Sequence, residues 1–324
     1  MDFKERQERF AKGLFPLASL QFELTSCCNG KCKHCYNNSG NNAVSDRMTI
    51  NNWLFFSKYL VKHGGVYEYI LSGGEPFLLG DGLFKIMDVL NASDTCFMLL
   101  TNGYFLNEEK VQILKKYKYH WLQISIDGVN AEYHDSFRMI KDGWKHAVNG
   151  ARLVSKHGIP LKIAHCVTPY NINDIDAMCD LAYNIGAKEI IVGMLCYSGR
   201  TSLNKDYLLS KKQTDILWNK VLKNQEKYKG RMRVKSSNSI KEGLIKHMKK
   251  PYSAAVIRPN GDIRLDGMAP FVVGNVLEDD FASVWQHRIF ESWTDSRVLE
   301  YINSFDEMDR NLNFVNYYNK DIYI

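Results

Sequence analysis

The chain has 324 residues, of which 45% are hydrophobic, so it can bury one large core or two smaller ones. Its 42 Lys and Arg against 36 Asp and Glu give a net charge of +6, which is too diffuse to predict binding to nucleic acid. No apolar run is long enough to span a membrane, and residues 1–10 lack the apolar segment of a secretory signal. The eight cysteines all lie in the first two thirds, unlike those of a secreted disulfide scaffold, so we expect a cytoplasmic protein.

Hydrophobic periodicity predicts alternating strands and helices up to residue 203, after a polar helical lead-in at residues 1–17. The predicted strands cover residues 18–24, 66–71, 96–100, 121–126, 161–167 and 189–195. The predicted helices cover residues 45–63, 83–90, 107–117, 143–156 and 174–185. Such alternation predicts an α/β fold with a parallel sheet, and six units are too few for a closed eight-stranded barrel. We therefore expect a partial (β/α)6 TIM-like barrel.

The character of the chain changes after residue 203. Two lysine-rich amphipathic helices are predicted at residues 211–227 and 240–249. Two short apolar strands then flank Pro259-Asn260-Gly261, a strong hairpin signal, and a strand and a helix follow at residues 272–276 and 281–290. We therefore expect four parts: a lead-in at 1–17, the barrel at 18–203, a helical linker at 204–250, and a small α+β C-terminal domain with a tail at 251–324.

Three cysteines follow the first predicted strand, in the run Cys28-Asn29-Gly30-Lys31-Cys32-Lys33-His34-Cys35-Tyr36. So short a loop can wrap three thiolates around a cubane iron–sulfur cluster. Because a cluster held wholly by protein takes four cysteines, a set of three leaves one iron for another ligand. A structural zinc site is the alternative, with His34 as its fourth ligand.

Two further polar segments end predicted strands of the barrel, where parallel sheets place their ligand sites. The first is Gly73-Gly74-Glu75-Pro76, in which glycines permit a close backbone approach and the carboxylate suits an ammonium group. The alternative there is a plain turn with a surface glutamate. In the second, Gln123-Ile124-Ser125-Ile126-Asp127-Gly128, Ser125 and Asp127 share one face of the strand.

The cysteine spacing and these two segments together resemble the radical S-adenosylmethionine (SAM) superfamily. In that family the cysteines, here Cys28, Cys32 and Cys35, hold one [4Fe–4S] cluster whose open iron is chelated by SAM. Reductive cleavage of SAM gives a 5'-deoxyadenosyl radical that abstracts a hydrogen atom from the substrate. The resemblance also implies an electron donor of flavodoxin or ferredoxin type.

The same resemblance implies the residues that contact SAM. Arg138 is the candidate for its carboxylate, because a guanidinium pairs bidentately with a carboxylate; the alternative is a surface pair with Asp135 or Asp142. Asn102 is either a pocket residue or a left-handed turn residue. The full predicted set of SAM contacts is Tyr36, Gly73, Gly74, Glu75, Pro76, Asn102, Ser125, Asp127 and Arg138.

The C-terminal hairpin, followed by Gly274-Asn275-Val276 and Ser283-Val284-Trp285, resembles the auxiliary-cluster module called SPASM, or its shorter Twitch form. Asp266 stands where that module has its hairpin cysteine, and the sequence has no cysteine after Cys196. We therefore expect a degenerate, cysteine-free SPASM-like domain, and a single cluster in the protein.

Enzymes with this module mostly modify peptides, so the resemblance implies a peptide-maturing enzyme that crosslinks or epimerises its substrate. Few residues precede the first strand, so leader recognition would need a separate leader-binding protein or the basic helices. The absence of an auxiliary cluster to accept an electron favours redox-neutral epimerisation, while crosslinking, its oxidative alternative, stays open. Cys166 and Cys196 end the fifth and sixth strands and are candidate hydrogen donors; the alternative is that both are inert, buried cysteines.

Two other functions stay open from the residues. One is a radical SAM enzyme that acts on a small molecule in cofactor, haem or nucleoside metabolism. The other is a zinc- or cluster-binding scaffold without catalytic activity. Cys27, directly before the motif, is not part of the predicted ligand set.

Overall fold

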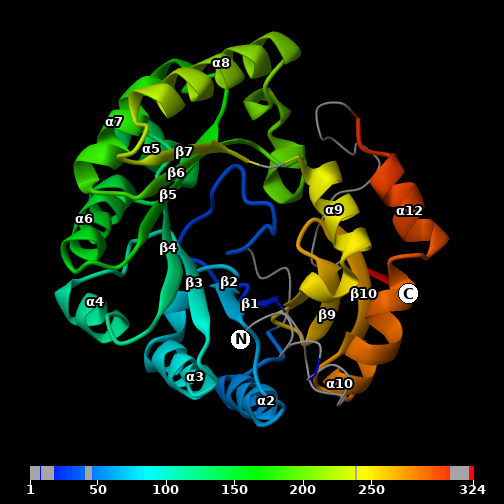
Figure 1. Ribbon diagram of the computed structural model, residues 1–324. Coiled ribbons are helices and arrows are strands. Elements are labelled where there is room, and N and C mark those ends of the chain that lie inside the picture. The colour runs from blue at the N-terminus through cyan, green and yellow to red at the C-terminus, as the bar shows by residue number, and fades with distance from the viewer. Residues whose placement is uncertain (1–7, 9–17, 41–45, 238, 307–320) are drawn as a thin grey trace. The chain divides into compact units, whose positions relative to one another are not determined.

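The computed structural model (Figure 1) describes residue 8 and residues 18–40, 46–237, 239–306 and 321–324. The chain forms two compact units. The first unit comprises residues 1–28, 39–97 and 239–324, and the second comprises residues 29–38 and 98–238. The helix predicted at residues 1–17 lies, apart from Glu8, outside the described residues.

The first unit carries the start of the predicted barrel sequence and the C-terminal hairpin. Its strands follow the order β11-β10-β9-β8-β1-β2. The bounds are β1 Ser19–Glu23, β2 Glu68–Ser72, β8 Ala254–Ile257, β9 Asp262–Asp266, β10 Ala269–Asn275 and β11 Ile322–Tyr323. Strand β8 pairs with β1 in parallel, and β9 pairs antiparallel with both β8 and β10. The predicted hairpin strands therefore extend the sheet from β1.

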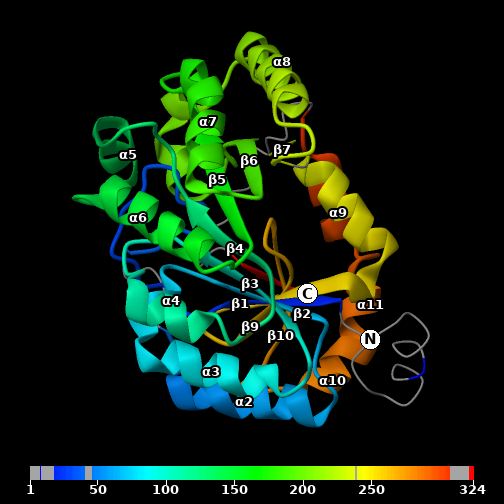
Figure 2. The ribbon, with the colours of Figure 1, turned by 60° about the vertical axis from the view of Figure 1, so that its left-hand side comes forward.

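Two helices pack beside β1 and β2 and lie next to each other in Figure 2: α2, Ile50–Lys62, and α3, Asp81–Asn91. Helix α2 is capped at its N-terminus by Thr49, whose hydroxyl accepts from the N–H of Asn52 in a capping box. Its Trp53 ring lies 4.8 Å from the Phe22 ring, and the Trp53 indole donates to the Leu24 carbonyl at 3.1 Å. The apolar stripe of α2 thus fixes the end of β1, from which the cysteine loop begins.

The C-terminal helices of the first unit are α9, Ile240–Lys249, a helical run from Phe281 to Ser292 that contains α10 and α11, and α12, Ser296–Asn303. Beside the hairpin strands, the fully buried Arg258 and Arg264 pair with Asp321. Burial raises the pKa of Asp321 to about 7, although Arg258 counteracts that rise. The end of the tail, for which the sequence predicts no position, therefore lies against buried arginines, while residues 307–320 fall outside the description.

The second unit is a parallel sheet with helices outside it (Figure 1). Its strands β4 Tyr119–Ser125, β5 Leu161–Val167, β6 Glu189–Met194 and β7 Arg233–Ser236 pair in sequence order. Its helices are α4 Glu108–Leu114, α5 Ala131–Arg138, α6 Gly143–Lys156, α7 Ile175–Ile185 and α8 Lys211–Lys227. Strand β3, Cys96–Thr101, passes from one unit into the other.

The mixed α/β fold agrees with the predicted TIM-like partial barrel. Strand β7 and helix α5 are additions that the sequence analysis does not contain. The predicted domain boundaries stay a prediction. Among the described residues, no helix is long and apolar enough to cross a membrane.

Candidate active site

In the first unit, the predicted glycine segment crosses the backbone that leads to the cysteines. The Gly74 N–H donates to the Thr25 carbonyl at 2.6 Å, and the Glu75 N–H donates to the Cys27 carbonyl at 2.9 Å. A Cβ at Gly74 would lie 1.9 Å from the Cys27 carbonyl oxygen, and Gly73 has a φ of +119°. Both positions therefore require glycine, for close approach and for backbone conformation respectively.

Glu75 is fully buried, so the alternative of a surface glutamate is wrong. Its carboxylate accepts from the N–H of Phe77 and begins a short 3₁₀ helix, Pro76–Leu79. Asp46, which the sequence analysis does not single out, accepts from Thr25 Oγ1 and Ser26 Oγ, each at 2.5 Å. Glu75 thus fixes the turn after the two glycines, and Asp46 fixes the backbone that precedes the cysteines.

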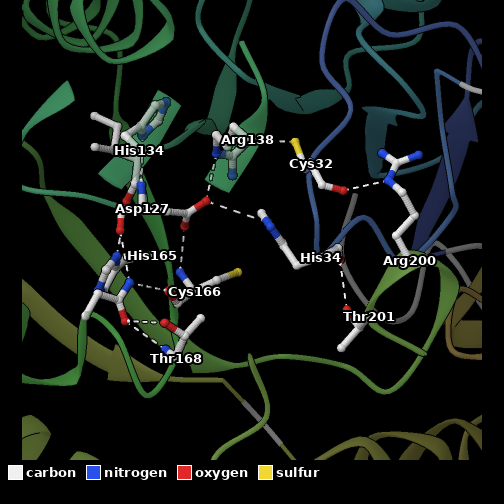
Figure 3. Close-up of polar contacts among 12 residues, drawn as sticks. Cys32, His34, Asp127, His134, Arg138, His165, Cys166, Thr168, Arg200 and Thr201 are labelled. Atoms are coloured by element: carbon white, nitrogen blue, oxygen red, sulfur yellow. Dashed lines mark hydrogen bonds and ion pairs between the residues drawn. The ribbon is translucent and has the colours of Figure 1, made fainter. Parts of the chain in front are cut away.

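In the second unit, the fully buried Asp127 carboxylate is the centre of a polar network (Figure 3). Arg138 Nε donates to its Oδ2 at 2.7 Å, and the Cys166 N–H donates to its Oδ1 at 2.8 Å. Burial by itself would raise the pKa of Asp127, but Arg138 and nearby histidines hold that pKa well below its usual range. Arg138 therefore pairs with Asp127, and the alternative pair with Asp135 or Asp142 is wrong.

Neutral groups complete this network. The Asp127 N–H donates to His134 Nδ1 at 3.1 Å, and burial lowers the pKa of His134 to about 3. His165 Nδ1 contacts the Ile126 carbonyl at 3.2 Å, which assigns the ring proton to that nitrogen. The Asn171 amide donates to the carbonyls of Asp127 and Cys166, each at 3.0 Å. The ends of β4 and β5 are thus locked together.

The cysteine loop reaches the same network. Arg138 Nη1 lies 4.0 Å from Cys32 Sγ, and His34 Nε2 lies 3.6 Å from Asp127 Oδ2. The His34 ring stacks on Phe137 at 4.3 Å. Ligand atoms of His34, Asp127 and Cys166 all lie within 4.8 Å of one another. Burial raises the pKa of Cys32 to about 11, so a metal must displace its proton before the thiolate can bind.

The remaining residues of the predicted site differ in their contacts and in their burial. Asn102 is not a left-handed turn residue, because the positive φ in this turn, +79°, belongs to Gly103. The Asn102 amide donates to Asn29 Oδ1 at 2.7 Å, and its side-chain oxygen accepts from the Tyr104 N–H. Ser125 ends β4 and is half-buried, as are Tyr36, Cys28, Cys35 and Cys196. Cys28 belongs to the first unit, and Cys32 and Cys35 belong to the second. Cys27 is exposed.

Residues after β6 contact the cysteine loop, although the sequence analysis assigns them no role. Arg200 Nε donates to the Cys32 carbonyl at 2.6 Å, and Asn204 Nδ2 donates to the Lys33 carbonyl at 3.1 Å. The one signal in the sequence is Ser198-Gly199-Arg200 directly behind a strand end, which by itself predicts only a turn.

Comparisons with known proteins agree on the family. The Radical SAM superfamily profile matches residues 22–182. The chain is 26% identical over 301 residues to the AdoMet-dependent heme synthase of Methanosarcina barkeri (strain Fusaro / DSM 804), covering 87% of this chain and 86% of the relative. It is 34% identical over 168 residues to the antilisterial bacteriocin subtilosin biosynthesis protein AlbA of Bacillus subtilis (strain 168), covering 52% of this chain and 37% of AlbA.

The fold agrees as well. The crystal structure of Streptococcus suis SuiB bound to S-adenosylmethionine superposes with a TM-score of 0.71 at 15% identity, covering 97% of this chain and 80% of SuiB. The matched residues 22–182 contain all three motif cysteines, the glycine segment and the Asp127–Arg138 pair. This chain is a radical SAM superfamily enzyme, and the family's cofactors are SAM and a [4Fe–4S] cluster.

Proposed function

We propose that this enzyme modifies a peptide, by epimerisation or by crosslinking, after abstraction of a hydrogen atom. The observation that carries the peptide assignment is the match to AlbA, a bacteriocin biosynthesis protein, at 34% identity over 168 residues. AlbA is matched over only 37% of its own length, so its substrate is a guide to the class of molecule and no more.

The side chains present fit the cofactors of the family. We assign Cys28, Cys32 and Cys35 to the cluster, because three thiolates in one short loop are the donor set that leaves an iron open. We assign Gly73, Gly74, Glu75 and Pro76 to the SAM amine, and Tyr36, Asn102, Ser125 and Asp127 to the other predicted contacts of SAM. Arg138, oriented by Asp127, is assigned to the SAM carboxylate. Bound there, the cofactors supply a radical that abstracts hydrogen.

The thiol that we propose as hydrogen donor is Cys166, with Cys196 as a second candidate. Its backbone is fixed on both sides, by the Asp127 carboxylate and by the Asn171 amide. Burial, and then the Asp127 charge, raise the pKa of Cys166 well above its usual value, so it carries an S–H bond at neutral pH. In an epimerisation this S–H bond breaks and a substrate C–H bond forms, and an external one-electron donor with a proton restores the thiol.

The partners and the compartment belong to the same proposal. A flavodoxin- or ferredoxin-type protein would supply electrons, and a separate leader-binding protein or the basic helix α8 would recognise the substrate. A reducing cytoplasm suits eight cysteines of which none forms a disulfide bond in the structure.

Haem metabolism is the second candidate, because the M. barkeri heme synthase matches 87% of this chain. A porphyrin substrate brings carboxylates that need cationic partners. Two candidates for that role, Arg258 and Arg264 of the first unit, are fully buried and already paired with Asp321. This pairing removes these two arginines as partners for porphyrin carboxylates.

The test is anaerobic co-expression, in heavy water, with any short peptide found to be encoded beside the gene, followed by mass spectrometry of the peptide. A mass loss of two hydrogens supports crosslinking. A peptide that loses no hydrogens but has one hydrogen replaced by deuterium supports epimerisation. An unaltered peptide, with turnover of an iron porphyrin by the purified enzyme, would overturn the peptide assignment in favour of haem metabolism. Cys166→Ala that still forms the epimerised product would remove Cys166 as the donor.

A further inference from the structure

Five consecutive carbonyl groups of the cysteine loop, from Cys32 to Tyr36, accept hydrogen bonds from one short segment, Ser198–Asn204. The bonds, in loop order, are Arg200 Nε to Cys32 at 2.6 Å, Asn204 Nδ2 to Lys33 at 3.1 Å, Thr201 Oγ1 to His34 at 3.3 Å, Arg200 N to Cys35 at 2.9 Å and Ser198 Oγ to Tyr36 at 2.9 Å. Arg200 Nη1 also donates to Asn38 Oδ1 at 3.0 Å. We call Ser198–Asn204 the carbonyl clamp.

The clamp is built for contact with the loop. Gly199 has a φ of +52°, and a Cβ there would lie 2.2 Å from the Cys35 carbonyl oxygen and 2.3 Å from that of Tyr36. Arg200 is only 7% exposed, and Thr201 is fully buried. Figure 3 shows Arg200 and Thr201 reaching the backbone of the loop that carries Cys32 and His34. The close approach needs glycine, and the buried donors need these acceptors.

We propose that the carbonyl clamp positions the cluster-binding loop, and that the guanidinium of Arg200 sets the charge around the cluster. The potential of an iron–sulfur cluster depends on nearby charge and on hydrogen bonding around its ligands. Arg200 touches the backbone of one predicted ligand, Cys32, through its side chain and of another, Cys35, through its N–H. Arg200 is therefore a positioning residue. Its proposed role depends on the family's cluster but does not depend on which substrate the enzyme modifies.

A purely structural tie and an electrostatic role make different predictions for two variants of Arg200. Arg200→Lys keeps the positive charge but loses the planar guanidinium that bonds the Cys32 carbonyl and Asn38 together. Arg200→Gln loses the charge while keeping an amide donor. If Arg200 only holds the loop in place, both variants should lose iron more readily than the wild type. The midpoint potential of the cluster should then be the same in the two variants.

The first experiment compares two glycine substitutions in protein reconstituted anaerobically with iron and sulfide. Gly199→Ala places a methyl group against the loop, whereas Gly158→Ala has a φ of +74° and no atom within 4 Å of its new Cβ. Both substitutions strain the backbone, but only the first displaces the loop. We expect at least a twofold loss of iron in Gly199→Ala and full loading in Gly158→Ala. Equal loading of the two would overturn the positioning role.

The second experiment measures the midpoint potential of the cluster by redox titration followed by electron paramagnetic resonance. We expect Arg200→Gln to have a more negative potential than the wild type and Arg200→Lys to stay near the wild type. Identical potentials in Arg200→Gln, Arg200→Lys and wild type would overturn the electrostatic role.

A third variant covers the case in which Arg200→Gln fails to fold. Asn204→Asp has the same shape but replaces the amide donor with a carboxylate that faces the carbonyls of Lys33 and Arg200. We expect it to fold, as judged by far-ultraviolet circular dichroism, and to release iron several-fold faster to a chelator. A wild-type release rate would contradict the clamp. Because these readouts need no substrate, they are independent of the peptide assignment.

Discussion

At the residue scale, Asp127 is the centre of the polar network in the second unit. The alternation around Ser125 and Asp127 predicts that both side chains share one face of the strand. The structure adds the hydrogen bonds of Asp127, which accepts from Arg138 and from the Cys166 N–H. These partners lie 11 and 39 residues further along the chain. No local pattern pairs residues so far apart, so a sequence supplies candidates for a site but not the bonds among them.

Asp127→Asn tests this pair. The substitution leaves the buried Arg138 guanidinium without the opposite charge at 2.7 Å, so we expect the free energy of unfolding at pH 7 to fall by about 3–5 kcal/mol. The low folded-state pKa of Asp127 means that its contribution is present at neutral pH and is lost only as the pH falls through that value. Anaerobic urea unfolding of the apoprotein measures the change.

The control is Glu226→Gln, whose ion pair with Lys229 has both side chains 76% exposed. Solvent screens such a pair, so its loss should change the unfolding free energy by less than about 1 kcal/mol. Equal effects of the two substitutions would show that the Asp127 pair is not a buried charge pair in solution.

A buried neutral histidine gives a pH dependence. The pKa of His134 is lowered to about 3, mainly by burial, so the unfolded chain takes up a proton on this residue below about pH 6.5 while the folded chain does not. Stability must therefore decrease as the pH falls from about 6.5 towards 4, by roughly 1 kcal/mol per pH unit for this residue. We expect the slope of unfolding free energy against pH to be smaller by that amount in His134→Gln. An unchanged slope would place a charged His134 in the folded protein.

At the element scale, helices and strands with strong periodicity are predictable to the residue. Helices α6 and α8 and strand β5 have the predicted bounds, whereas α5, with its polar surface, carries too weak an apolar stripe to be predicted. Strand β7, Arg233–Ser236, is short and has a single apolar residue, Val234, and it is a strand because β6 supplies its hydrogen-bonding edge. A strand that forms because a neighbouring strand pairs with it cannot be predicted from its own residues alone.

Gly74→Ala tests the crossing between the glycine segment and the backbone before the cysteines. The new Cβ would lie 1.9 Å from a backbone oxygen, so we expect a loss of at least about 1–3 kcal/mol of unfolding free energy and poor incorporation of iron. The matched control is Gly243→Ala in helix α9 of the same unit, where no atom lies within 4 Å. That change should stabilise the protein by roughly 0.5–1 kcal/mol. Chemical denaturation measures the unfolding free energy of both variants, and iron analysis measures how much cluster each incorporates.

At the scale of the whole molecule, the sequence is sufficient for the family, the cysteine loop and the sheet class, because each depends on short motifs or on periodicity. The attachment of β8 to β1, the buried arginines of the hairpin and the clamp on the cysteine loop depend on contacts between distant segments. Those features decide how the motifs are held, and they became visible only with the fold.

Asp266 tests the prediction of a single cluster. In the structure its carboxylate accepts from the Met268 N–H at 2.7 Å and contacts His247 Nδ1 at 2.6 Å, so it ties a turn to helix α9. We expect Asp266→Ala to keep the iron content of the wild type, about four per chain. A lower iron content, with circular dichroism unchanged, would show that Asp266 ligates a second cluster.

The carbonyl clamp also bears on how the protein is made. Arg200 lies 168 residues after Cys32, whose carbonyl it binds, and Asn204 lies 171 residues after Lys33. At roughly 5–20 residues per second, a ribosome needs on the order of ten seconds or more to synthesise that stretch. During this interval the nascent cysteine loop has none of its clamp donors. The loop therefore acquires its final conformation late in translation, and iron delivered earlier would meet thiols that are not yet arranged to hold a cluster.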